Sequence, residues 1–441
     1  MTQYDHYDIV ITNGFILPAA GLQHTINGYI GIKDGLIKNI APEYQKSSFS
    51  AATTIDAKDG LICPGLINGH CHSAMTLFRG LADDLPLMTW LNEYIFPAEA
   101  RFVTREMVYW CSKLAAAEMI LTGTTTVADG YFFELDAVKA FNDSGIRSVA
   151  AQGIIDFPAP GIPDPIANLL EAKRFLDNFP HGSLSHKALF CHSPYTCSPQ
   201  TLQKAKRLAD DNNCLMFIHA AETQAECSQI KESYGLSPVR HLNSLGILDE
   251  NTVCVHCITI DEHEIKLLKD SGCGVVTCPE SNMKLASGIA PIPELIRNGV
   301  PVALGTDSCA SNNTLDLFSE MNSLAKLHKV VCSDPTVLSA REALAAATTV
   351  GAKVLGLPDT GSLQPGMLAD IIIIDLNQPH LTPFYNQNSL VYCAKGADVN
   401  TSIIDGKLVM HDRKILTFDL DETLAHVAGL STAVAGFSKS L

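Results

Sequence analysis

The chain has 441 residues, of which 46% are apolar and 18% are charged, and its formal net charge is −16. This composition is typical of a folded globular protein and excludes a long disordered chain. The acidic balance argues against nucleic acid or an anionic membrane as a partner, because both attract basic surface.

The N-terminal residues, MTQYDHYDIV, lack the cationic start of a signal peptide. No window has the ~18 consecutive apolar residues that a membrane helix needs. There are fourteen cysteines, and several lie inside apolar runs, for example Cys63, Cys191 and Cys254. Such cysteines are expected to be reduced thiols that serve as small core residues. We therefore expect a cytoplasmic protein without a membrane partner.

The first sixty residues consist of short alternating runs with Asn-Gly and Asp-Gly pairs, in residues 7–18, 26–41 and 50–65. This pattern predicts β-hairpins. The same texture returns in residues 369–377 and 399–416, with an Asp-Gly pair at Asp405 and Gly406. We expect the two β-rich ends to pair into one small composite β-sandwich domain.

The middle of the chain alternates short apolar runs with segments of helical character. Eight such runs are candidate strands: residues 61–72, 124–130, 147–156, 187–194, 214–222, 252–257, 273–281 and 301–308. Eight βα units indicate an α/β protein with a (β/α)8 TIM-type barrel, although a doubly wound open sheet is the competing interpretation. The expected boundaries are 1–63 for the N-terminal part of the β-sandwich, 64–365 for the barrel and 366–441 for the C-terminal part.

Polar residues recur where these predicted strands end, which is where a barrel of this type carries its chemistry. Any one of them alone would more often be a hydrogen-bonded core or loop residue. Their repetition at strand after strand favours a shared site. The residues are His70, His72, His192, His219, His256 and Asp307.

His70 and His72 stand two positions apart, so in an extended strand they point to the same face and can bind one metal ion. His219 and Asp307 can complete a catalytic set that leaves one position open for water. Glu222 follows His219 by three residues, and it is either a general base or a carboxylate that favours a helix N-terminus.

The residue pattern alone leaves the roles of His256 and Glu99 open. His256 is flanked by Cys254 and Cys257, but no second thiolate pair supports a zinc site there, so a hydrogen-bonding role toward developing charge fits better. By pattern alone, Glu99 is an ordinary exposed or helix-capping glutamate.

Several stretches together resemble the amidohydrolase superfamily and, more closely, its methylthioadenosine / S-adenosylhomocysteine deaminases. The stretches are PGLINGHCHSAMTLFRGLADDLPLMTWL, FPAEARF, HSPYTCS, HAAET, SNMKLASGIAPI, LGTDSCASNNTLDLFSEMN and GSLQPGMLADIIIIDLNQPHLTP. The similarity extends over almost the whole chain. The metal motif is shared with enzymes that act on guanine, triazines and other aminoheterocycles, so it specifies the superfamily better than the substrate.

The resemblance implies one divalent metal ion, zinc, held by four residues: His70, His72, His219 and Asp307. A single ion is implied because His192 stands where binuclear relatives would carry a carboxylated lysine. Catalysis would rest on Glu222 for proton transfer, on His256 for orienting the nucleophile and stabilising charge, and on Asp307 for sharing the proton transfer.

Substrate binding is implied for Glu99, through the ribose hydroxyls, and for His192, together with the catalytic Glu222 and Asp307. Trp90 lies in the segment ADDLPLMTWLNEYIF, which is either an apolar wall over the substrate or ordinary packing.

The implied reaction is hydrolytic deamination of an adenine nucleoside, with methylthioadenosine favoured over S-adenosylhomocysteine. The loop DFPAPGIPDPIANL lacks the arginine expected for an amino-acid tail. The implied partners are a small nucleoside substrate and further copies of the chain in a homo-oligomer. The alternatives are another hydrolase of the superfamily, acting on a purine, pterin or triazine, and a non-catalytic scaffold.

Overall fold

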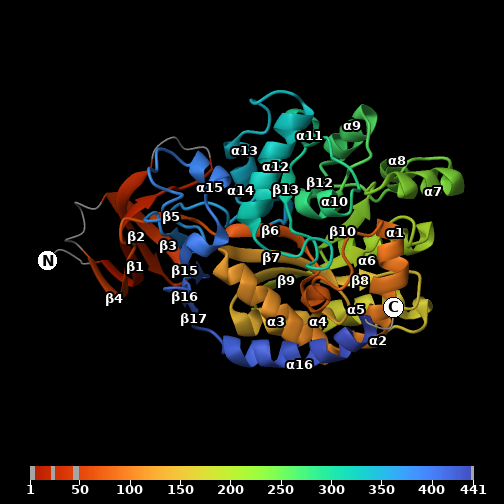
Figure 1. Cartoon of the computed structure of the whole chain (residues 1–441), viewed down its shortest axis with the longest axis horizontal. Coiled ribbons are helices and arrows are strands. Elements are labelled where there is room, and N and C mark those ends of the chain that lie inside the picture. The colour runs from red at the N-terminus through yellow and green to blue at the C-terminus, as the bar shows by residue number, and fades with distance from the viewer. Residues whose placement is uncertain (1–4, 21–24, 43–48, 439–441) are drawn as a thin grey trace.

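The computed structural model describes residues 5–20, 25–42 and 49–438. Figure 1 shows a barrel surrounded by helices, with a second sheet at one end built from the red N-terminal and blue C-terminal strands. Within the described ranges, none of the helices combines the length and the apolar character that crossing a bilayer requires.

The barrel contains eight parallel strands, and they correspond to the eight apolar runs of the sequence. Neighbouring strands along the chain pair with one another, from β6 at one edge to β13 at the other. This order confirms the (β/α)8 interpretation over the doubly wound one, because it never reverses. The strands are β6 (Leu66–Cys71), β7 (Thr124–Tyr131), β8 (Arg147–Ile154), β9 (Ser185–Cys191), β10 (Leu215–Ala220), β11 (Thr252–His256), β12 (Gly274–Thr277) and β13 (Val302–Leu304).

Backbone hydrogen bonds bring the first and last barrel strands together at their carboxyl ends. The carbonyl of His70 accepts from the amides of Thr306 (3.2 Å) and Asp307 (3.0 Å). Gly305 makes this approach possible, since a Cβ atom there would lie 2.8 Å from the His70 nitrogen. The barrel interior is filled by the apolar side chains of a single cluster, which includes Ile67, Phe190, Phe217 and Val255.

The remaining strands form one nine-stranded sheet from both ends of the chain, which confirms the expected composite β unit. β1 pairs with β2 on one side and with β4 and β5 on the other, and β5 pairs with β14. The strands are β1 (Asp5–Ile16), β2 (Ile26–Lys33), β3 (Leu36–Pro42), β4 (Phe49–Asp56), β5 (Leu61–Pro64), β14 (Ile371–Ile374), β15 (Val399–Ile404), β16 (Lys407–His411) and β17 (Lys414–Ile415).

The expected hairpins are only partly right. Asp34-Gly35 and Asp405-Gly406 do turn the chain between paired strands, with positive φ at both residues of each pair. Asn13-Gly14 does not: it lies inside β1, where the register shifts. That strand bends there without reversing, because its two halves pair with different strands, β4 and β5.

Helices follow most barrel strands, and some begin at a side chain that caps them, such as Thr104 before α3 and Ser198 before α6. The helices are α1 (Leu87–Thr89), α2 (Phe96–Phe102), α3 (Arg105–Leu121), α4 (Glu134–Ser144), α5 (Asn168–Asp177), α6 (Pro199–Asp211), α7 (Gln224–Tyr234), α8 (Pro238–Ser244), α9 (Glu262–Ser271), α10 (Pro279–Lys284), α11 (Ile292–Arg297), α12 (Leu317–Val331), α13 (Ala340–Ala346), α14 (Thr349–Val354), α15 (Asn388–Tyr392) and α16 (Leu420–Ser438). Other helical turns are η2 (Ser73–Phe78), η3 (Trp90–Ile95, a π-helix), η4 (Pro165–Ala167) and η5 (Gly396–Asp398).

Candidate metal centre and active site

The barrel brings the polar strand-end residues to one mouth, as the sequence pattern predicts. His70 lies in β6 and His72 directly after it, His219 lies in β10, and His256 is the last residue of β11. His192 follows β9 directly, and Asp307 lies three residues beyond the end of β13. All six side chains line or adjoin the same cavity.

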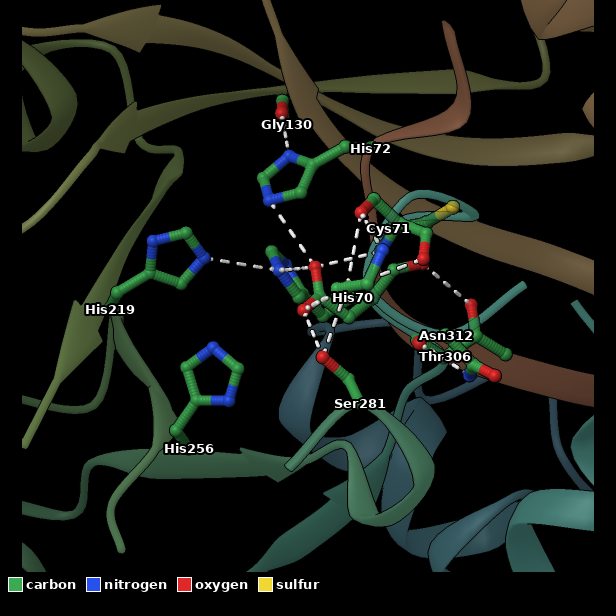
Figure 2. A network of polar contacts seen from close by, with 12 residues as sticks. His70, Cys71, His72, Gly130, His219, His256, Ser281, Thr306 and Asn312 are labelled. Atoms are coloured by element: carbon green, nitrogen blue, oxygen red, sulfur yellow. Dashed lines mark hydrogen bonds and ion pairs between the residues drawn. The ribbon is translucent and has the colours of Figure 1, made fainter. Parts of the chain in front are cut away.

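Three imidazoles and one carboxylate converge closely enough to bind a single metal ion. Within the described ranges, one nitrogen from each of His70, His72 and His219 lies within 4.8 Å of the others. The Asp307 Oδ1 atom lies 3.6 Å from His70 Nε2 and 3.5 Å from His72 Nε2. Figure 2 shows His70, His72 and His219 directed toward one another.

The protonation of these imidazoles suits metal binding, which requires a free nitrogen lone pair. Burial lowers the pKa of His70 to about 4, against the opposing effect of Asp307. Burial and the neighbouring imidazoles hold the pKa of His219 well below its ordinary value. His72 directs Nδ1 at the carbonyl of Gly130, so that Nδ1 donates and Nε2 is free to bind a metal ion. The residues present therefore fit a divalent ion.

Asp307 is held in place by hydroxyl groups from a neighbouring segment. Its Oδ2 atom accepts from Ser281 (2.7 Å) and Ser311 (2.9 Å), and its backbone has a left-handed φ of 59°. Although burial alone would raise the pKa of Asp307, its interaction with His70 and the nearby imidazoles holds that pKa well below the usual range. Asp307 is thus an ionised carboxylate with one oxygen directed at the three histidines.

Glu222 lies in the turn between β10 and α7, and not on the helix itself, because α7 is capped one residue later by Thr223. Its Oε2 atom is 4.0 Å from His256 Nε2. Burial raises the pKa of Glu222, and the nearby His256 opposes that shift. On its other side, His256 Nδ1 lies 2.9 Å from the Oδ1 atom of Asn282. Because an amide oxygen only accepts, Nδ1 carries the hydrogen and Nε2 faces Glu222 without one in the neutral ring.

A cavity of about 330 Å³ extends from the metal centre and is lined largely by apolar side chains. Trp90 is buried in its wall, where Leu87 and Leu91 also line it. His192 lines the cavity too, and burial lowers the pKa of that residue to about 4.

Glu99 lies on α2 and lines the same cavity, so the interpretation of an ordinary exposed glutamate is wrong. It is only 8% exposed, and its Oε1 atom accepts a hydrogen bond of 2.6 Å from the hydroxyl of Tyr131. Burial raises the pKa of Glu99 to about 7, and the bond from Tyr131 opposes that effect. Among the described residues, none donates a hydrogen bond to its Oε2 atom, so this buried carboxyl group is suited to recognising hydroxyl groups.

Sequence reasoning missed three residues that contact this site: Tyr131, Asn282 and Glu226, whose carboxyl oxygens accept from the amides of Ala221 and Glu222. Tyr131 is the last residue of β7, so the strand-end pattern could have found it, but it lies one residue beyond the predicted run 124–130. Asn282 contacts His256 from a different strand-helix unit, and no local spacing reports such a contact. Glu226 resembles any glutamate in the first turn of a helix.

Several known proteins are similar to this chain over most of its length. Residues 61–409 match the family model described as "Amidohydrolase family". A "5-methylthioadenosine/S-adenosylhomocysteine deaminase" of Syntrophobacter fumaroxidans is 44% identical over 432 residues, which cover 97% of this chain and 98% of that protein. A "5'-deoxyadenosine deaminase" of Methanosarcina mazei is 44% identical over 420 residues, covering 93% of this chain and 95% of that one.

A solved structure has a similar fold. The adenosine deaminase of Xanthomonas campestris, solved with bound zinc, superimposes with a TM-score of 0.96 at 34% sequence identity. The match covers 98% of this chain and 100% of that one. With the eight-stranded barrel and the histidine centre already described, these matches show that the chain belongs to the amidohydrolase family.

Proposed function

We propose that the protein is a metal-dependent hydrolytic deaminase of adenine nucleosides and that its ion is zinc. The observation that carries this proposal is that Glu222 and Glu99 line the same cavity as His72, His219 and Asp307, and that His70 adjoins these three residues. The deaminase names of the relatives and the zinc in the similar structure from Xanthomonas campestris support it.

His70, His72, His219 and Asp307 would hold the ion. Three nitrogen donors and one carboxylate, with room left for water, are typical of a catalytic zinc site. A divalent ion held there supplies Lewis acidity, which makes a water molecule nucleophilic near neutral pH.

The chain's own residues move the protons. Glu222 takes a proton from the attacking water as the bond from oxygen to C6 of the adenine forms. It then passes that proton to the exocyclic amine. The bond from C6 to this nitrogen breaks, ammonia departs, and an inosine-type product remains. His256 orients the water through Nε2, in the tautomer that Asn282 selects. Asp307 shares the proton transfer.

Glu99 and His192 bind the nucleoside. Glu99 has one oxygen held by Tyr131, and the other oxygen accepts from the ribose hydroxyls. Trp90 packs against the substrate as part of the apolar wall.

The 5′-substituent that the cavity favours is small and apolar. Phe157, Pro158, Ala159 and Pro160 line the cavity from the loop after β8. Among the described residues that line it, none is lysine or arginine to pair with a carboxylate tail. We therefore place methylthioadenosine first among the substrates, with 5'-deoxyadenosine close to it and S-adenosylhomocysteine behind both.

Ammonia release across a substrate panel tests this proposal. We expect kcat/KM for methylthioadenosine and 5'-deoxyadenosine to exceed that for S-adenosylhomocysteine by about tenfold or more, since pairing a buried carboxylate is worth at least ~1.4 kcal/mol. Adenosine, guanine and a triazine complete the panel. Turnover of guanine or the triazine without any turnover of methylthioadenosine would refute the assignment.

We also propose the boundaries 1–63, 64–365 and 366–441 for the β-sandwich and barrel parts, supported by β5 and β14 pairing in the small sheet. We further propose that the protein is a homo-oligomer in the cytoplasm. The fourteen free cysteine thiols support this compartment, because thiols stay reduced there. Light scattering on the purified chain and cell fractionation test these two points.

A further inference from the structure

Glu226 lies behind the catalytic turn and has partners unlike those of an ordinary helix-capping glutamate. It is 4% exposed, and among the described residues it forms no ion pair. Its Oε1 atom accepts from the amide of Ala221 (3.0 Å), and its Oε2 atom accepts from the amide of Glu222 (2.7 Å). Both oxygens of this buried carboxyl group are therefore directed at the backbone that carries Glu222.

The next strand-helix unit shows the ordinary arrangement. At the start of α9, Asp261 accepts from the amide of Glu264, and Glu264 accepts in return from the amide of Asp261 at 2.9 Å. This reciprocal pair is a capping box. At the start of α7, Thr223 accepts from the amide of Glu226. The Glu226 side chain, however, accepts from the amides of Ala221 and Glu222 and not from the amide of Thr223.

The backbone that Glu226 holds is strained and joins two catalytic loops. Ala221 has a φ of 54°, a left-handed conformation that costs a residue other than glycine roughly 1–2 kcal/mol. The carbonyl of Ala221 accepts from the amides of Ile258 (3.0 Å) and Thr259 (2.9 Å), which closely follow His256. The bonds to Glu226 thus fix the turn through which the loops of Glu222 and His256 are connected.

We propose that Glu226 is a positioning residue for the deamination: by holding the amides of Ala221 and Glu222 it directs the Glu222 carboxylate toward His256 and the metal centre. The inference rests on the proposed function, because that function assigns the proton transfer to Glu222. Glu226 is not among the described residues that line the cavity, and in that part of the chain no hydrogen bond or ion pair joins its side chain to a proposed metal ligand.

The substitution Glu226→Gln tests the inference, since it replaces one accepting oxygen with an NH2 group that cannot accept from an amide. We expect kcat to fall by about 10–100-fold, because displacing a catalytic group by about 1 Å has effects of this size. KM and the zinc content per chain should stay within about twofold of the wild type. Unchanged kcat, or a loss that only parallels lost zinc, would overturn the proposal.

Glu264→Gln is the matched control. Glu264 is 2% exposed, occupies the same position in the first turn of its helix and accepts from a backbone amide. A general effect of weakening a buried cap would lower kcat equally in both variants and would count against the proposal. We expect the control to lower the melting temperature while kcat stays within about twofold. Should Glu226→Gln fail to fold, Glu226→Asp, which shortens the reach by one methylene, replaces it with the same expected loss.

Two further measurements separate positioning from mere stability. If Glu226 acts through Glu222, the double variant Glu222→Gln/Glu226→Gln should be no slower than Glu222→Gln alone, whereas additive losses would contradict this. Hydrogen exchange should lose protection at the amides of Ala221 and Glu222 in Glu226→Gln, and retained protection would overturn the proposal whatever the activity. A wild-type enzyme without adenine nucleoside deamination would refute the proposed function, while the exchange result would still decide the role of Glu226.

Discussion

Buried carboxyl groups surround the cavity, and each is held by a different kind of partner. Asp307 accepts from two serine hydroxyls and Glu99 from a phenol. Asp129 accepts from the amide of Ser73 at 2.6 Å, next to His72, while burial and Asp129 raise the pKa of Glu134 well above its ordinary value. The surroundings of each carboxyl group therefore set the direction in which its pKa shifts.

Burying the carboxyl group of Glu99 changes how the stability of the protein depends on pH. Burial raises the pKa of its carboxyl group from 4.5 to about 7. The unfolded chain ionises at the lower value, so this group contributes stability that is present below pH 4.5 and lost as the pH rises through about 7. Glu99→Gln removes the ionisation, and we expect it to stabilise the protein at pH 8, by on the order of 3 kcal/mol at most. Thermal melts at pH 5 and pH 8 measure the effect.

The same variant should impair nucleoside binding. Its side-chain amide offers an NH2 group where, in the proposed complex, the carboxylate of Glu99 would accept from ribose, so kcat/KM for a nucleoside should fall about tenfold or more. A free base that is turned over would lose little. Equal losses for nucleoside and free base would argue against ribose contact, and equal melting shifts at both pH values would argue against a buried ionisable group.

At the residue scale, the proposed metal ligands could be picked out from the sequence because parallel barrel strands place their ends together. His70, His219 and Asp307 needed only that rule. The contacts that hold the surrounding side chains could not be predicted in this way. Asn282 reaches His256, and Tyr131 reaches Glu99, across gaps in sequence that carry no periodic signal. Which tautomer or oxygen is used depends on such contacts, so the roles were less predictable than the ligands.

At the scale of the elements, the cavity wall that carries Trp90 and Glu99 has an unusual structure. It consists of η3, a π-helix, followed by α2, and π-helices are rare outside functional sites. The C-terminal helix α16 runs beside α3 and α2, as Figure 1 shows along one side of the barrel. Phe437 of α16 lies 5.5 Å from Phe102 at the end of α2, measured between ring centroids, and His426 stacks on Trp110 of α3. Helix α16 thus packs against the helix that carries Glu99 in the cavity wall.

A pair of substitutions on α16 tests whether this packing supports the cavity wall. Val434 is 4% exposed and belongs to the main core, whereas its neighbour Ala433 is exposed. Val434→Asp should loosen α16, lower the melting temperature by about 5 °C or more and raise KM severalfold, with kcat and zinc content kept. Ala433→Asp should change none of these values. A Val434→Asp enzyme with wild-type KM would show that α16 does not support the wall.

Element prediction succeeded where a pattern depended on burial and failed where it depended on turn chemistry. The eight barrel strands are buried on both faces, so their apolar runs marked them clearly. The pair Asn13-Gly14 satisfies the same local rule as Asp34-Gly35, but tertiary pairing of β1 with β4 and β5 keeps the chain extended there. The run from Leu61 to His72 divides into two strands, since β5 belongs to the small sheet and β6 to the barrel.

At the scale of the whole molecule, a buried ion pair joins the barrel to the small sheet. Arg147 begins β8, at the opposite end of the strand from the cavity. Its Nε and Nη2 atoms lie 2.8 Å and 3.0 Å from the two carboxylate oxygens of Asp370, just before β14. Asp370 also accepts from the amide of Asp405, in the turn between β15 and β16. This arginine therefore has a structural partner and is not among the described residues that line the cavity.

Arg147→Ala should be strongly destabilising, because it leaves the Asp370 carboxylate buried without its partner. We expect a loss of about 3–5 kcal/mol in the free energy of unfolding, measured with urea. Lys173→Ala is the control, since its pair with Asp177 at 2.7 Å is exposed and is worth about 0.5 kcal/mol or less. Losses of similar size in both variants would mean that the buried pair does not join the two parts.

The bonds from Thr306 and Asp307 to the carbonyl of His70 have a consequence for how the enzyme is made. Asp307, the proposed fourth ligand, is translated long after His70, and the meeting of β6 with β13 brings the two residues together. A nascent chain that has left the ribosome through β12 carries the three imidazoles but not Asp307. If these four residues hold an ion as proposed, loading would have to wait until synthesis has passed the last barrel strand.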